Sequence, residues 1–175
     1  MKRRHWLMGT CALLGSAAFG FGYWSKRWEY IVIHHSGGNY GNIDFLQQVH
    51  RERQPQDPID AIPYHFIIGN GNGLPMGSVS SDWRRNKHIW GSHVSGRNWS
   101  HNWKGLGICL IGNFELQAVP PEQYASLVKL TRRLMYEYNI PPENVNGHGH
   151  IRGESTLCPG KHFPMQQFIG DISES

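Results

Sequence analysis

Short apolar runs along the chain alternate with segments in which apolar residues recur at helical spacing. Three runs, at 29–34, 64–68 and 106–111, are rich in β-branched and aliphatic residues and lead into glycine-containing segments. This pattern predicts three buried strands. The sequence GNGNG at 69–73 favours positive φ angles and predicts a hairpin after the second strand.

Three further segments predict helices. Residues 44–53 form a short predicted helix that turns Phe45, Leu46 and Val49 inward. The Pro120-Pro121 pair opens the longest helix, which extends to about residue 139. Its core face is predicted to carry Leu127, Leu130, Leu134 and Tyr138. A last short helix is expected at 164–169.

Strands interleaved with helices predict an α/β fold in a single domain, with a central mixed β-sheet and helices on its faces. A chain of 175 residues, 39% of them hydrophobic, can build one sizeable core. Three cysteines and the lack of a visible repeat argue against a disulfide scaffold, a solenoid or a coiled coil.

The N-terminus carries a separate signal. Lys2, Arg3 and Arg4 precede residues 6–24, which contain no charged side chain. Residues 1–25 are therefore expected to act as an export signal or as an N-terminal membrane anchor helix ahead of a domain at 28–175. Such a segment predicts localisation to the periplasm or cell envelope, with attachment to the inner membrane if the segment is not cleaved. An apolar helix packed on the domain is the alternative.

Net charge is +4, but this excess does not indicate a nucleic-acid partner. Three of the 17 basic residues lie at positions 2–4, and the rest of the chain has nearly equal numbers of basic and acidic residues. Affinity for a phosphate backbone needs clustered positive charge. We therefore expect no nucleic-acid binding, and a monomer is the default assembly.

Histidines gather at the ends of the predicted strands and in the loops. His34 and His35 follow the first strand, and the sequence GHGHIRGESTLCPG at 147–160 contains His148, His150 and Cys158. A hydrolytic zinc ion takes three protein ligands in a tetrahedral shell and keeps one position for water. Two histidines and one cysteine thiolate satisfy that requirement.

Five segments together resemble one known family. They are YIVIHHSGG (30–38), YHFIIGNGNG (64–73), GSHVSGRN (91–98), LGICLIGNF (106–114) and the Cys158 segment. They occur in the order found in zinc-dependent N-acetylmuramoyl-L-alanine amidases of the phage-lysozyme and peptidoglycan-recognition-protein type. The resemblance covers about residues 29–168. It implies a Zn2+ hydrolase that cleaves the amide between N-acetylmuramic acid and L-alanine in peptidoglycan, whose glycan strand and stem peptide are the partner.

The resemblance also implies a ligand set. The first histidine of the pair matches the family's first zinc ligand, which gives His34, with His35 as the nearby alternative. The second histidine ligand of the family stands eight residues before its cysteine ligand. Counting back from Cys158 selects His150, and His148 is displaced by two. The implied metal ligands are therefore His34, His150 and Cys158.

The family's other functional positions fall on polar residues of this chain. Tyr64 matches a tyrosine whose hydroxyl reaches the metal-bound water or the oxyanion. Thr156 stands where some members have a lysine and where catalytic peptidoglycan-recognition proteins have threonine. His93 matches a histidine of the substrate groove, although a structural role fits it equally. Arg97 and Asn98 are candidates for holding a stem-peptide carboxylate.

Two classes of function remain open at this point. A zinc amidase requires all three ligands, and candidates for all three are present. A non-catalytic peptidoglycan-binding module would recognise the same polymer without cutting it, and such members of the family typically lose a ligand. A zinc hydrolase of another amide is a weaker third reading, because fold and metal alone do not define the bond that is cut.

Overall fold

A computed structural model describes residues 26–174, which form a five-stranded mixed sheet. The strand order is β3-β2-β4-β1-β5. Neighbouring strands run parallel except β3, which is antiparallel to β2 at one edge. The strands are β1 (Tyr30–His35), β2 (Phe66–Ile68), β3 (Val79–Ser81), β4 (Gly105–Leu110) and β5 (Val145–Gly147).

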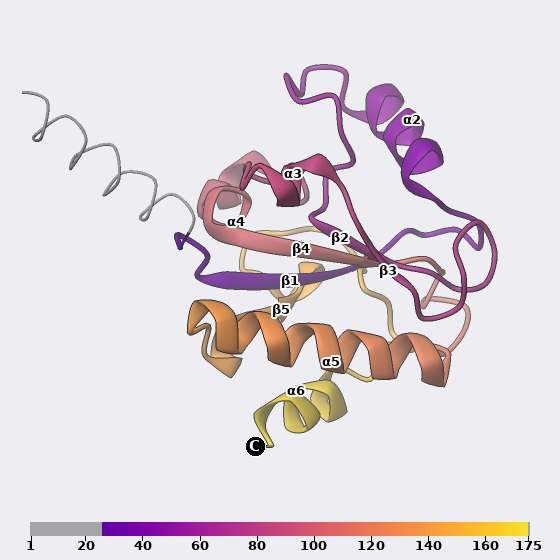
Figure 1. Ribbon diagram of the computed structural model, residues 1–175, viewed down its shortest axis with the longest axis vertical. Coiled ribbons are helices and arrows are strands. Elements are labelled where there is room, and N and C mark those ends of the chain that lie inside the picture. The colour runs from indigo at the N-terminus through magenta and orange to yellow at the C-terminus, as the bar shows by residue number, and fades with distance from the viewer. Residues whose placement is uncertain (1–25, 175) are drawn as a thin grey trace, which may run out of the picture.

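Helices cover both faces of this sheet (Figure 1). One face carries α2 (Ile43–Arg53), α3 (Trp83–Asn86) and α4 (Trp99–Lys104), and the other carries α5 (Pro121–Tyr138) and α6 (Met165–Ser173). Three short 3-10 turns complete the fold, at Gly96–Asn98, Pro142–Asn144 and His148–His150. The predicted α/β fold with a central mixed sheet is confirmed.

The central strands are apolar because both of their faces are covered. All six residues of β4 are buried. On the α5 side, Leu127, Leu130 and Leu134 pack into the larger core cluster, as their helical spacing predicts. A smaller cluster on the α2 side includes Leu46 and Cys109.

One inward position predicted for α2 is wrong. Phe45 is 40% exposed and packs against the ring of Tyr40, with 5.1 Å between the ring centroids. Leu46 and His50 are the buried residues of this helix. The helix begins where the Asn42 side chain caps the Phe45 N–H, and this start turns Phe45 toward solvent.

Arg84 in α3 is fully buried and joins several segments of the α2 layer. Its guanidinium donates to the carbonyl oxygens of Ile62 and Trp90, both at 2.7 Å, and to the carboxylate of Asp57 at 2.5 Å. His50 lies 2.8 Å from the same Asp57 oxygen. Burial raises the pKa of Asp57, but its hydrogen bonds and the Arg84 charge outweigh burial and hold that pKa below its usual value. The loop before β2 is thus fixed by a buried ion pair.

The predicted export signal or membrane anchor at 1–25 lies outside the described residues. Among residues 26–174, no helix is both long and apolar enough to cross a membrane. The prediction of export and the domain boundary near residue 28 therefore stay predictions.

Candidate metal centre

Two histidines emerge side by side at the carboxyl edge of the sheet. β1 and β5 are neighbouring parallel strands, and Ile33 pairs with Gly147 in their register. His34 and His148 are the next residues along the two chains. Their ring centroids lie 4.7 Å apart. The strand register therefore determines which histidine of the 147–160 segment meets His34.

The loop after β5 folds back to add a thiol. The N–H of Gly149 donates to the carbonyl oxygen of Cys158 at 2.6 Å, and a Cβ on Gly149 would lie 2.4 Å from the carbonyl oxygen of Thr156. Only glycine permits this approach. Cys158 Sγ then lies 3.8 Å from His34 Nδ1. One candidate ligand atom from each of His34, His148 and Cys158 lies within 4.8 Å of the other two.

His150, the second histidine ligand expected from the sequence, is outside this cluster. His148–His150 form a single 3-10 turn, in which successive side chains are about 120° apart, so residues 148 and 150 point to different sides. The exposed His150 lies against Gly147, where an added Cβ would be 2.6 Å from its Nδ1. The geometry therefore favours His148, ten residues before Cys158, over His150 as the second histidine donor, and the ligand assignment itself stays a prediction.

A chain of hydrogen bonds fixes the orientation of His34. Nε2 of His93 lies 3.3 Å from the carbonyl oxygen of Gly105, which can only accept. Burial lowers the pKa of His93 to about 3, so its ring is neutral near pH 7 and its one proton is on Nε2. Its Nδ1 therefore accepts from His34 Nε2, 3.2 Å away. This leaves the lone pair of His34 Nδ1 on the side of Cys158.

His148 is oriented in the same way by a carboxylate. Its Nε2 lies 3.0 Å from Glu154 Oε2, which leaves Nδ1 free. The Ser95 hydroxyl donates to Glu154 at 2.7 Å and the Asn98 amide at 2.6 Å. Burial raises the pKa of Glu154, but these hydrogen bonds outweigh burial and keep the pKa below its usual value. An ionised carboxylate behind a histidine is a common support of metal ligands.

The protonation states suit a metal cation. Burial lowers the pKa of both His34 and His148, and the neighbouring histidines lower that of His34 further. Both rings are therefore neutral near pH 7. Burial raises the pKa of the Cys158 thiol to about 12, against a smaller lowering by the N–H of His35. A cation at the three donors would reverse that rise and hold the thiolate.

The three donors open onto a cavity of about 270 Å³. Tyr64 and Thr156, the two predicted catalytic residues, both line it. The Tyr64 ring lies 5.0 Å from that of His34. The Thr156 hydroxyl oxygen accepts from the Cys158 N–H at 3.2 Å, so its proton can point elsewhere.

The three expected substrate contacts have different surroundings. His93 lines the cavity, but it is only 5% exposed and both its ring nitrogens have protein partners, so it also positions His34. Asn98 donates to Glu154 and thereby supports His148. Arg97 is exposed in the 3-10 turn before α4 and is not among the residues that line the cavity.

Sequence reasoning missed three contributors to this site. Glu154 and Ser95 act through hydrogen bonds between segments far apart in the chain. Arg53, at the end of α2, lines the cavity and brings a positive charge to its rim. Glu154 could have been found from the sequence, because it is a carboxylate within the 147–160 segment and carboxylates commonly hydrogen-bond to ligand histidines.

The role assigned to Glu154 makes a direct prediction. Glu154→Gln should weaken zinc binding about 10- to 100-fold, because His148 loses the carboxylate that orients it. The measurement is a zinc titration against a competing chelator. Glu143→Gln, on an exposed residue of the 3-10 turn before β5, is the matched control and should bind zinc as the native chain does. Native zinc affinity in Glu154→Gln would exclude this support.

Comparison with known proteins places the chain in a family. The sequence profile described as N-acetylmuramoyl-L-alanine amidase matches residues 24–161. The endolysin N-acetylmuramoyl-L-alanine amidase LysCS from Clostridium intestinale URNW has a TM-score of 0.70 at 29% identity, covering 87% of this chain and 88% of its own.

Two curated proteins are also similar. Peptidoglycan-recognition protein SC2 of Drosophila melanogaster is 28% identical over 77% of this chain and 70% of its own length. The amidase AmiD of Escherichia coli K12 is 32% identical over 44% of this chain and 25% of its own length. Because the amidase profile spans most of the chain, this protein belongs to the N-acetylmuramoyl-L-alanine amidase family.

Proposed function

We propose that this protein is a zinc-dependent N-acetylmuramoyl-L-alanine amidase, which hydrolyses the amide between N-acetylmuramic acid and L-alanine in peptidoglycan. The observation that carries the proposal is the complete donor set of His34, His148 and Cys158, with two neutral imidazoles held by their Nε2 atoms. Membership of the amidase family supports the choice of substrate. A zinc ion at these donors would polarise the scissile carbonyl and lower the pKa of water.

The residues around the donors fit the hydrolysis of an amide. Burial raises the pKa of Tyr64 well above its usual value, so its hydroxyl stays protonated and can donate. Thr156 keeps its hydroxyl proton free because its oxygen accepts from the Cys158 N–H. Both side chains line the cavity and can donate to the oxyanion that forms when water attacks the carbonyl carbon.

Tyr64→Phe should lower kcat about 100- to 1,000-fold while the zinc content stays native, because an oxyanion donor is lost and no metal ligand is changed. Steady-state release of stem peptide, measured beside zinc content, tests this. Tyr40→Phe removes the hydroxyl of an exposed tyrosine and should leave kcat unchanged. An unchanged kcat in Tyr64→Phe would remove this residue from the mechanism.

A non-catalytic peptidoglycan-binding module is the second candidate. The similarity to peptidoglycan-recognition protein SC2 favours it, since recognition is part of that protein's name. The complete donor set favours the amidase, because binding without cleavage has no need of a metal with an open position.

One experiment separates the two candidates. The full chain, purified without chelators, is assayed for zinc and incubated with purified peptidoglycan. About one zinc per chain, with new L-alanine amino termini that disappear on chelation, supports the amidase. Sedimentation with peptidoglycan but no new amino termini would support the binding module and contradict the proposal.

A further inference from the structure

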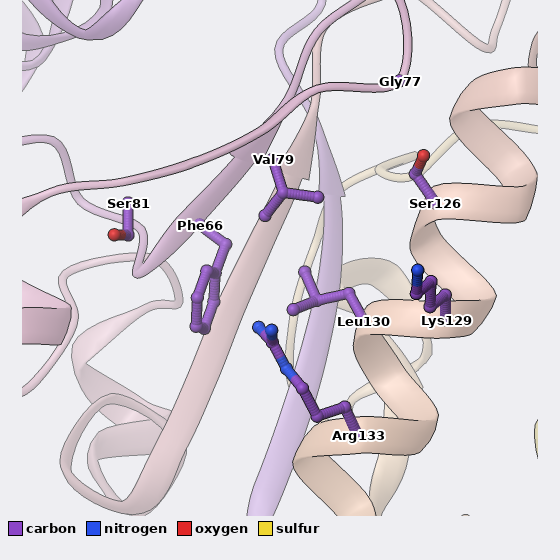
Figure 2. A pocket seen from close by; sticks show the side chains of 8 residues that line it. All are labelled: Phe66, Gly77, Val79, Ser81, Ser126, Lys129, Leu130 and Arg133. Carbon is purple, nitrogen blue, oxygen red and sulfur yellow. The ribbon is translucent and has the colours of Figure 1, made fainter.

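A second cavity, of about 470 Å³, lies between the edge strand β3 and helix α5. Figure 2 shows Phe66 and Val79 from the sheet and Leu130 from α5 pointing into one space, with the Arg133 guanidinium reaching toward Phe66. We call this the β3–α5 groove. None of the residues that line it also lines the metal cavity, so it is a separate site.

The charge of the groove is positive. Lys129 and Arg133 line it from successive turns of α5, and no carboxylate is among the lining residues. Neither cation has an ion-pair partner within residues 26–174. The nearby Glu137 pairs with Arg85 at 3.3 Å. Like charges four residues apart destabilise a helix, so this pair costs stability unless an anion joins it.

The other wall of the groove is an open sheet edge. β3 pairs only with β2, so among the described strands its outer edge has no neighbour. Its N–H and C=O groups on that side can pair with an added strand. Val79 and Ser81, two residues apart, line the groove, and residues of an added strand would also alternate between the groove and solvent. Gly77, with φ +67°, brings the chain onto α5, where an added Cβ would lie 2.9 Å from Ser126 Oγ.

We propose that the β3–α5 groove binds an extended acidic peptide segment of a partner protein as an added strand on β3. Main-chain hydrogen bonds to β3 supply the register, as in other cases of strand addition. Apolar side chains of the segment pack on Val79, which is 43% exposed beside the buried Phe66 and Leu130. Its carboxylates pair with Lys129 and Arg133 and supply the negative charge that is missing from the residues lining the groove. This inference does not depend on the metal centre.

The test uses the full chain and a labelled peptide, Val-Thr-Glu-Thr-Val-Thr-Glu, which places Val and Glu on one face of a strand and Thr on the other. Binding is followed by fluorescence anisotropy. The same peptide with Lys in place of Glu should bind at least about tenfold more weakly. Amide chemical shifts of Val79, Ser80 and Ser81 should change on addition of the acidic peptide.

The double variant Lys129→Glu and Arg133→Glu should lose at least about tenfold in affinity for the acidic peptide and should favour the lysine peptide. Lys87→Glu reverses an exposed charge outside the groove and should bind the acidic peptide as the native chain does. Amidase activity should stay native in both variant proteins, which separates this test from that of the proposed function.

Three results would overturn the proposal. Equal affinity for the two peptides would exclude recognition of acidic side chains, and unchanged shifts at β3 would exclude strand addition. If the native chain sediments as a dimer and the double variant as a monomer, the groove is instead the contact with a second copy of this chain.

Discussion

His148→Ala is expected to remove both bound zinc and amidase activity, whereas His150→Ala should retain both. His148 contributes one of three donors and has its Nδ1 free because Glu154 takes its Nε2. Loss of the ligand itself should weaken zinc binding by more than the 10- to 100-fold typical of a supporting residue. Zinc content after dialysis and release of L-alanine amino termini measure the two effects.

The two histidines form a useful comparison, because they lie in the same 3-10 turn, and of the two it is His148 that belongs to the donor cluster and bonds Glu154. Cys158→Ala should behave as His148→Ala does. Cys109→Ala, which removes a buried thiol outside the donor cluster, should keep its zinc. Zinc retained in His148→Ala and lost in His150→Ala would reverse the ligand assignment.

The second large effect concerns stability. Arg84→Met should lower the free energy of unfolding by about 3–5 kcal/mol, because it leaves the Asp57 carboxylate buried without its main cation. The carbonyl oxygens of Ile62 and Trp90 lose their donor as well. Urea unfolding followed by circular dichroism measures the change.

The neighbouring Arg85→Met is the control and should cost less than about 1 kcal/mol, since its pair with Glu137 is partly exposed. The pKa of Asp57 is lowered in the folded protein, so the contribution of the pair is present above the unfolded pKa near 4 and is lost as the pH falls below it. The difference between Arg84→Met and the native chain should therefore shrink in acid. An equal loss of unfolding free energy in Arg84→Met and Arg85→Met would show that the buried Arg84–Asp57 pair has no special role.

Much of the fold follows from apolar patterning. Strand β4 and residues 31–33 of β1 are apolar because α5 and the α2 layer cover both faces of the sheet, and such runs are visible in the sequence. The turn sequence at 69–73 correctly predicted that β2 is followed by an antiparallel neighbour. Strand β3 and helices α3 and α4 were not predicted, because three to six residues give too little periodicity for recognition.

The structure favours a different second histidine donor from the one expected, for a related reason. Counting back from Cys158 assumes the family's spacing of eight residues, whereas His148 stands ten residues before Cys158. Strand β5 points to His148, because it places this residue beside His34. Its three residues, Val145, Asn146 and Gly147, carry no strong strand signal, and tertiary pairing alone makes them a strand.

Supporting residues were the least accessible to sequence reasoning. The carboxylate of Glu154 receives hydrogen bonds from Ser95 and Asn98, which lie more than 50 positions earlier in the chain. The buried ring of His93 lies between two partners from different strands, the Gly105 carbonyl oxygen of β4 and Nε2 of His34 in β1. Such contacts depend on packing between segments, so the sequence did not reveal the hydrogen bonds by which His93 and Asn98 support the donor histidines, and their substrate roles stay predictions.

We propose that His34, His148 and Cys158 bind one zinc ion, and crystals of the protein grown with zinc, measured on both sides of the zinc absorption edge, test this directly. We expect one anomalous peak about 2.3 Å from Cys158 Sγ and about 2.0–2.1 Å from Nδ1 of His34 and of His148. A peak bound to His150, or no peak at these three residues, would contradict the proposed zinc site.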